Sequence, residues 1–250
     1  AEMTKVVFLG TNGWYDTPTG NTISILLDTP EATILLDAGN GLAKADRYAD
    51  PDKPAVLFLS HLHLDHVIGL HALNKLRFER GLTILTQPGT KDALEALIGP
   101  PYSLAFSRLP YPVQVREFAG AYAGHGVALE SLPMQHSDPT IGFRLAVEGK
   151  TVAYCPDTGY CEAAVRLACN ADLLIAECAF RSGEESEGWP HLNPETAAGI
   201  AVEAGAEKLA LVHFDAFRYP DMASRIQAEA QARAVFANTQ AAVDELVLEV

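Results

Sequence analysis

Cysteine and long apolar runs are both scarce in this 250-residue chain. The only cysteines are Cys155, Cys161, Cys169 and Cys178, and no Cys-x-x-Cys pair occurs among them. Their placement in or beside apolar segments indicates reduced, mostly buried thiols, which favours a cytoplasmic location. No segment has the roughly 20 apolar residues of a membrane span, so no membrane partner is expected. We interpret Ala1-Glu2, before Met3, as an addition to the natural chain, and we expect no signal peptide.

Basic residues are also few. The chain has 18 Lys and Arg against 32 Asp and Glu, a net charge of −14. Because affinity for RNA rests on many Lys or Arg contacts to phosphates, this charge disfavours a nucleic-acid partner without excluding one. No Pro/Ser-rich linker, repeat or low-complexity tract divides the chain, and 48% hydrophobic residues suffice for a substantial core. We therefore predict a single domain over residues 1–250.

The most informative motif is His61-x-His63-x-Asp65-His66, which directly follows the apolar run 55–59. A buried strand that ends in such a cluster delivers histidine and carboxylate ligands to one loop at the rim of a sheet. These ligand types suit Zn²⁺, Mn²⁺ or Fe²⁺ rather than a thiolate-selective site. One ion cannot easily take all four side chains, which indicates two metals side by side. The alternative is a set of solvated loop histidines.

Short apolar runs and helical stretches alternate along the chain. Candidate helix caps are Gly89-Thr90 and Asn193, with Pro194 at a first helical position and Gly205 at a helix end. Helices are predicted over residues 90–98, 162–168, 194–204 and 222–239. Strands are predicted near residues 6–9, 22–27, 33–36, 55–59, 83–85, 113–118, 127–132, 141–147, 151–154, 173–176 and 208–212. This alternation permits an α/β fold of two packed sheets.

Further candidate ligands stand at the ends of later predicted strands. They are His136, Asp157 and His213, and Asp37 occupies a similar place early in the chain. Taken singly, His136 and His213 are compatible with hydrogen-bonded loop imidazoles, and Asp157 with an Asx turn. In this order, and behind the histidine motif, the pattern resembles the metallo-β-lactamase superfamily, in which Asp37 matches an early structural aspartate.

The resemblance implies a fold, a cofactor and a ligand set. The fold is an αββα four-layer sandwich, and the cofactor is two divalent metal ions, zinc by preference. One ligand group would be His61, His63 and His136, the other would be Asp65, His66 and His213, and Asp157 would bridge them. Two such ions about 3.5–4 Å apart hold a hydroxide at neutral pH and spread the charge of the transition state. Asp65 would also accept the proton of the attacking water.

Two segments resemble the ribonuclease Z branch in particular: residues 8–24, and residues 177–180 followed by 191–198. Relatives in this branch place a histidine at the position of His191, which touches the scissile phosphate or protonates the leaving oxygen. An acidic residue at the position of Glu177 holds that imidazole. Such a carboxylate favours the protonated form that a general acid needs. The alternative is that His191 only caps the helix that begins near Pro194.

The chain also departs from ribonuclease Z. Gly20 stands where many relatives carry a basic residue, and the long arm that grips transfer RNA has no counterpart. Only a strand pair is predicted between His136 and Asp157, and only one short helix between Asp157 and Glu177. The pattern therefore indicates a short form of this branch.

We expect a dinuclear metal-dependent hydrolase, most simply a phosphodiesterase that acts on small phosphodiesters or cyclic nucleotides. The alternatives are a ribonuclease Z-type RNA endonuclease, a hydrolase of lactones, thioesters, β-lactams or sulfate esters, and a metal-binding relative without turnover. Trp14, Tyr15 and Trp189 are candidates for substrate contact. A homodimer is one option for the assembly.

Overall fold

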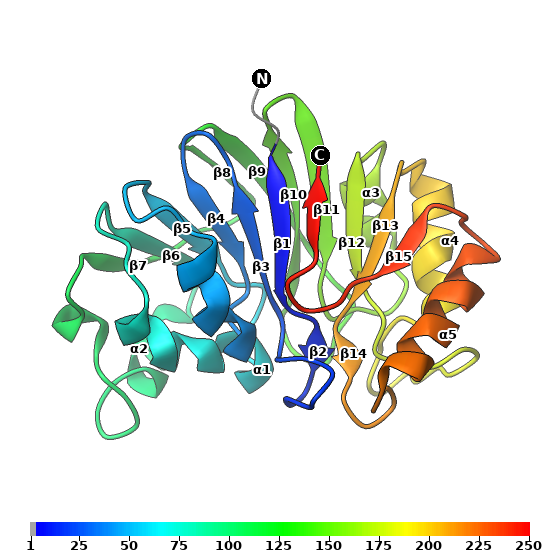
Figure 1. Ribbon diagram of the computed structural model, residues 1–250, viewed down its shortest axis with the longest axis horizontal. Coiled ribbons are helices and arrows are strands. Elements are labelled where there is room, and N and C mark those ends of the chain that lie inside the picture. The colour runs from blue at the N-terminus through cyan, green and yellow to red at the C-terminus, as the bar shows by residue number, and fades with distance from the viewer. Residues whose placement is uncertain (1–3) are drawn as a thin grey trace.

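A computed structural model describes residues 4–250, so the interpretation of Ala1-Glu2 lies outside the described residues. Two seven-stranded sheets pack face to face, and helices cover their outer faces (Figure 1). This arrangement confirms the predicted αββα sandwich. None of the helices in the described part of the chain is long and apolar enough to cross a membrane.

The first sheet comes mainly from the first half of the chain. Its strands, in spatial order, are β16 (Val247–Glu249), β1 (Lys5–Gly10), β3 (Ser24–Asp28), β4 (Thr33–Leu36), β5 (Ala55–Phe58), β6 (Leu82–Thr86) and β7 (Val113–Glu117). The four strands β4 to β7 run parallel to one another. On this half lie the 3₁₀ helices η1 (Asn40–Arg47), η2 (Ile68–Lys75) and η3 (Phe106–Arg108) and the α-helices α1 (Leu64–Val67) and α2 (Lys91–Leu97).

The second sheet comes from the second half. Its strands, in spatial order, are β15 (Thr239–Ala241), β13 (Leu209–Val212), β12 (Leu173–Glu177), β11 (Lys150–Cys155), β10 (Ile141–Val147), β9 (Val127–Pro133) and β8 (Ala121–Gly124). Helices α3 (Glu162–Ala168), α4 (Pro194–Ala204) and α5 (Met222–Arg233) cover it. A small third sheet pairs β2 (Asn12–Gly13) with β14 (Phe214–Asp215).

Three apolar layers hold the sandwich together, one between the sheets and one under each set of helices. In β5, Val56 and Phe58 enter the layer between the sheets, whereas Ala55 and Leu57 enter the layer under the helices. Successive side chains of a strand point to opposite faces, and here both faces are buried. This explains why the central strands are continuous apolar runs in the sequence.

The helix ends are partly as predicted. Asn193 caps α4 through its side chain, Pro194 is its first residue, and Gly205 follows the helix with a left-handed φ of 65°. Thr90 does not cap α2, because its hydroxyl donates to the carbonyl of Gln87 instead. The carboxylate of Glu117 accepts the hydrogen bond from the first backbone N–H of α2.

The prediction of one helix over residues 222–239 was wrong. Helix α5 ends at Arg233, and Thr239–Ala241 form β15, which pairs in parallel with β13. Pairing with β13 satisfies the backbone groups of this segment at the edge of the sheet. The sequence around this helix end contains neither Gly nor Pro, so nothing local marks the stop.

The strand directions bring several loops to one edge of the sandwich. Strands β4 and β5 are parallel in the first sheet, and β11, β12 and β13 are parallel in the second. Strand β9 runs in the same direction as β11, since β10 is antiparallel to both. The segments that follow these strands meet near α1, β2 and β14, at the lower edge in Figure 1.

Candidate metal centre and active site

The seven predicted metal ligands lie together at this edge. Both sheets contribute to the cluster, which places it at the seam between them. The first sheet contributes His61 and His63 after β5 and Asp65 and His66 on α1, and the second contributes His136, Asp157 and His213 after β9, β11 and β13.

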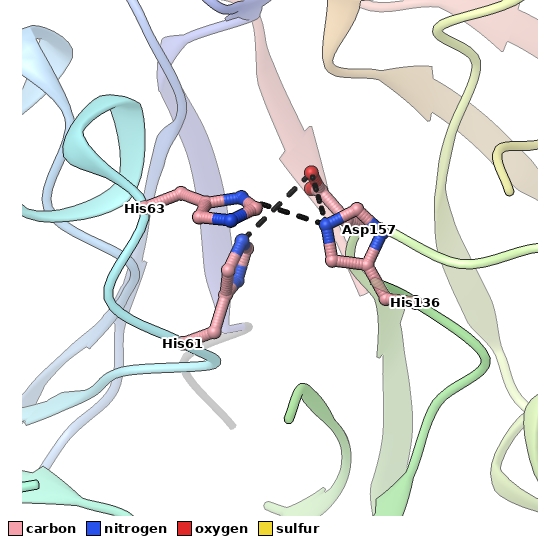
Figure 2. Close-up of side chains that lie close together, drawn as sticks. All are labelled: His61, His63, His136 and Asp157. Carbon is pink, nitrogen blue, oxygen red and sulfur yellow. Dashed lines mark hydrogen bonds and ion pairs between the residues drawn. The ribbon is translucent and has the colours of Figure 1, made fainter. Parts of the chain in front are cut away.

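The first group of donors consists of His61, His63, His136 and Asp157, whose ligand atoms lie within 4.8 Å of one another. Figure 2 shows their side chains converging from three segments. His136 Nε2 lies 3.6 Å from Asp157 Oδ2 and 3.5 Å from His63 Nδ1. His61 Nε2 lies 3.9 Å from the same carboxylate oxygen. The group therefore offers three imidazole nitrogens and one carboxylate oxygen.

The second group consists of Asp65, His66 and His213, again within 4.8 Å. His213 Nε2 lies 3.2 Å from both His66 Nε2 and Asp65 Oδ2. Asp157 Oδ1 lies 3.0 Å from His66 Nε2 and 3.2 Å from His213 Nε2. The two oxygens of Asp157 thus face different groups, as a bridging carboxylate requires.

Asp37 orients the ring of His66 from the side opposite the other donors. Its Oδ2 lies 2.8 Å from His66 Nδ1 and accepts a hydrogen bond from the hydroxyl of Tyr154. The backbone N–H and the hydroxyl of Ser60 donate to the same carboxylate. Asp37 is fully buried, and its φ of 55° turns the chain sharply at the end of β4. These contacts point the other ring nitrogen of His66 into the cluster.

The donors fit divalent cations. His61 Nε2 is buried and has no hydrogen-bond partner within residues 4–250, although its Nδ1 lies 3.0 Å from the hydroxyl of Ser60. Buried polar atoms are normally paired, so an unpaired nitrogen grouped with three other donors indicates a ligand atom. The mixture of imidazole and carboxylate donors is the one that Zn²⁺, Mn²⁺ and Fe²⁺ accept.

The charges of the cluster are coupled. Burial alone would lower the pKa of His66, but the carboxylates of Asp157 and Asp65 raise it well above its ordinary value. Burial alone would raise the pKa of the Asp65 carboxyl, but His66 and His213 hold it below its ordinary value. Burial lowers the pKa of His61 well below its usual range. The carboxylates are therefore ionised at neutral pH and demand positive charge beside them.

His191 and Glu177 form a pair beside the cluster. His191 Nδ1 lies 2.5 Å from Glu177 Oε1, and Glu177 is fully buried at the end of β12. Burial alone would lower the pKa of His191, but the carboxylate of Glu177 raises it to about 9. His191 also has a ring nitrogen within 4.8 Å of ligand atoms of Asp157 and His213. Because Asn193 caps α4, the alternative that His191 caps this helix is wrong.

Two aromatic candidates lie at the mouth and one does not. Trp14 and Trp189 line a cavity of about 20 Å³ together with Asp157, His191 and other residues of the cluster. The backbone N–H of Trp14 donates to Asp65 Oδ2 at 2.8 Å. Tyr15 is not among the residues that line this cavity.

Two residues at the site escaped the sequence analysis. Asp138 Oδ2 lies 2.8 Å from His63 Nε2. Its position two residues after the candidate ligand His136 is the sequence feature from which a role at the site could have been predicted. Arg225 on α5 is fully buried, and its guanidinium donates to the side chains of Thr11 and Asn12 beside the site. No local signal reveals Arg225, since a cation in an Ala-rich helix normally faces solvent.

Comparisons with known proteins agree with this geometry. The model of the beta-lactamase superfamily domain matches residues 32–214. Ribonuclease Z from Methanosarcina mazei is 27% identical over 99% of this chain and 98% of its own length. That alignment spans 309 positions, so the relative contains segments that this chain lacks.

Solved structures show the same fold. The metallo-β-lactamase fold protein YhfI from Bacillus subtilis superposes with a TM-score of 0.83 at 24% identity and covers 100% of both chains. A diphosphatase from the PhnP family superposes with a TM-score of 0.76 at 18% identity over 99% of this chain and 98% of its own. On the family match, the fold and the relatives together, this chain belongs to the metallo-β-lactamase superfamily as a ribonuclease Z-like, metal-dependent hydrolase.

Proposed function

We propose that the chain is a dinuclear metal-dependent phosphodiesterase that acts on small phosphodiesters. The observation that carries this proposal is the pair of His191 and Glu177 beside the seven donors. Hydrolysis of a phosphodiester must protonate an alkoxide leaving group, and a histidine held protonated by a buried carboxylate can do so. Lactone and activated ester hydrolysis needs such an acid much less.

Two divalent ions would be held by His61, His63 and His136 on one side and by Asp65, His66 and His213 on the other, with Asp157 between them. Such ions lower the pKa of water and offset negative charge on a phosphoryl group. Zinc suits this ligand set. Among the protein groups, Asp37 fixes His66, and Asp138 fixes His63.

Asp65 is placed to accept a proton. Its Oδ2 accepts a hydrogen bond from the backbone N–H of Trp14 at 2.8 Å, which fixes the carboxylate where it lines the cavity. The same oxygen faces His213 Nε2 at 3.2 Å. We assign Asp65 two roles, as a metal ligand and as the acceptor for the proton of the attacking water.

His191 is placed to donate a proton. Its Nδ1 is taken by Glu177, so Nε2 is the nitrogen left for the substrate. Glu177 is itself fixed, because it accepts the backbone N–H groups of Thr158 at 3.1 Å and Ala179 at 2.8 Å. The imidazole therefore keeps one orientation, with Nε2 as the nitrogen that donates a proton to the leaving oxygen.

A second candidate is RNA cleavage, because the curated relatives that match nearly the full chain are named ribonuclease Z. Three observations favour a small substrate instead. Only the β10–β11 hairpin lies between His136 and Asp157, and only the short helix α3 lies between Asp157 and the strand β12 that ends at Glu177. The aligned relative contains segments that this chain lacks, and the net charge of −14 opposes a polyanion.

The test uses purified protein loaded with Zn²⁺ or Mn²⁺ and a panel of substrates. Bis-p-nitrophenyl phosphate and adenosine 2′,3′-cyclic phosphate should be hydrolysed, and a chelator should abolish both activities. Precursor transfer RNA, a lactone, a thioester and a sulfate ester should react much more slowly. Efficient 3′ processing of precursor transfer RNA would support the second candidate, and preferred turnover of the lactone or thioester would overturn both.

A further inference from the structure

The two tryptophans of the chain gather at the mouth of the candidate active site. Trp14 comes from the loop after β2 and Trp189 from the loop before α4, yet their ring centroids are 6.3 Å apart and their planes cross at 88°. Trp14 is 62% exposed and Trp189 is 40% exposed. Two large aromatic side chains left in solvent over a cavity of polar groups indicate a binding surface.

Trp189 lies against the donors of the cluster. Its ring stacks on that of His63 at a centroid distance of 5.9 Å and an interplanar angle of 13°. The rings of His136 and His191 lie 5.6 and 5.9 Å from it. The indole therefore lies against both the first ligand group and the proposed acid.

Trp14 is placed by its backbone. Its φ of 75° is rare for a bulky residue, and its N–H is bound to Asp65. The preceding Asn12 donates through its side-chain amide to the carbonyl of Tyr15, which tightens the same turn. A strained conformation that leaves a large aromatic exposed over a site is typical of a functional position.

The cavity under the indoles admits a water molecule but no ester. Its volume of about 20 Å³ is close to the minimum for one water. A phosphodiester that enters must displace side chains that line the cavity, and Trp14 and Trp189 are the exposed ones among them. The group attached to its phosphate is then placed against these two indoles. A flat group gains contact on both sides in that position.

The charges around the cavity limit what this group can be. Outside the metal donors, the lining contains the acidic residue Asp215, and no Lys or Arg is among the residues that line the cavity. The adjoining segment contains Glu185 and Glu187, whereas its Glu184 is paired with Arg218. Apart from the metal donors and His191, which act on the scissile phosphate, no cationic side chain lines the cavity. A second phosphate would therefore lack a partner, and the group attached to the scissile phosphate is expected to be uncharged as well as planar.

We propose that Trp14 and Trp189 form an aromatic clamp that selects phosphodiesters with a single phosphate and a planar heterocycle, such as a nucleoside cyclic phosphate. The proposal rests on the phosphodiesterase function above. Stacking would direct binding energy to the heterocycle, while the donor cluster and His191 act on the phosphate.

The kinetic test compares two substrates with the same scissile bond. Adenosine 2′,3′-cyclic phosphate carries a base, and methyl riboside 2′,3′-cyclic phosphate carries a methoxy group in its place. The ratio of their kcat/KM values should be about tenfold or more in the wild type, the scale of one stacked base. Trp189→Ala and Trp14→Ala should each bring the ratio toward one, and Trp189→Phe should restore most of it.

Two controls separate stacking from structure. Tyr102→Ala removes an aromatic that is 75% exposed but does not line the cavity, and it should leave the ratio unchanged. Metal content should be measured for each Trp189 variant, because this ring packs on His63. A wild-type ratio near one, or a ratio that survives both alanine substitutions, would overturn the clamp while the phosphodiesterase function stands.

Fluorescence gives a second readout that needs no turnover. All indole emission of the chain comes from these two residues, since the sequence contains no other tryptophan. Adenosine 5′-monophosphate should quench the emission of the metal-loaded protein with excitation at about 295 nm, where the base hardly absorbs, and ribose 5-phosphate should not. If neither cyclic phosphate is hydrolysed, quenching by the nucleotide still supports the clamp, and equal responses to both ligands refute it.

Discussion

Replacing Glu177 by Gln tests the proposed acid, because this change removes a charge and keeps the shape of the side chain. The buried carboxylate serves three donors, the N–H groups of Thr158 and Ala179 and Nδ1 of His191. Gln has one acceptor oxygen and one NH₂ group, so at least one buried donor loses its partner. We expect a loss of about 1–3 kcal/mol in the free energy of unfolding.

The kinetic effect follows from the pKa of His191, which Glu177 raises to about 9. Without the carboxylate this pKa falls toward the ordinary value of about 6.5. A general acid works only while protonated, so activity is lost as the pH rises through its pKa. The alkaline fall in rate should therefore move to lower pH. Each unit of movement is about tenfold in rate on the alkaline side.

The assay is a pH–rate profile on two phosphodiesters, one with an alkyl leaving group and one with p-nitrophenol, below the unfolding temperature of the variant. His191→Ala should slow the alkyl ester strongly and the p-nitrophenyl ester weakly, because p-nitrophenolate leaves without a proton. Metal content should not change in either variant. Equal losses on both esters would mean that His191 binds the phosphate instead, and loss of metal would make it a ligand.

Four other substitutions test the ligand set and the residues that support it. Purified protein should contain about two metals per chain, and His66→Ala should lower that content, whereas one metal in both proteins would refute the dinuclear site. Asp65→Asn should retain the fold but lose roughly a hundredfold or more in turnover, and wild-type rates at full metal occupancy would remove both of its roles. Gly13→Ala would place a Cβ 2.6 Å from Cε1 of His213 and should lower metal content with little change in circular dichroism. Unchanged metal content would show that the loop moves to make room for the added methyl group. Arg225→Met should destabilise the protein by about 3 kcal/mol in urea unfolding, because the hydroxyl of Thr11 and the side-chain oxygen of Asn12 lose a charged donor.

The histidine motif and the strand ends could be predicted from the sequence because each depends on residues that are neighbours in the chain. A run such as 55–59 is apolar throughout because both faces of β5 are buried, and the loop after a parallel strand must emerge at the carboxyl edge of the sheet. The pairing of His191 with Glu177 was anticipated by resemblance, and the 2.5 Å contact agrees with it.

What the sequence did not reveal depends on partners distant in the chain. Helix α5 stops where β15 can pair with β13, and no residue near 233 announces that. The burial of Arg225 depends on acceptors contributed by Thr11 and Asn12, more than two hundred positions away. The clamp likewise requires that the loops of Trp14 and Trp189 meet, which only the packed sandwich decides.

The division of the donors between the two sheets has a thermodynamic consequence. Metal ions held by these residues would connect the two sheets across their common edge. A ligand that binds only the folded state adds stability that grows with its free concentration, about 2.7 kcal/mol at a hundred times its Kd. The melting temperature should therefore rise with free zinc and fall with chelation. In a cell short of metal, this added stability would be lost, so the supply of the cofactor would also govern the lifetime of the protein against proteases.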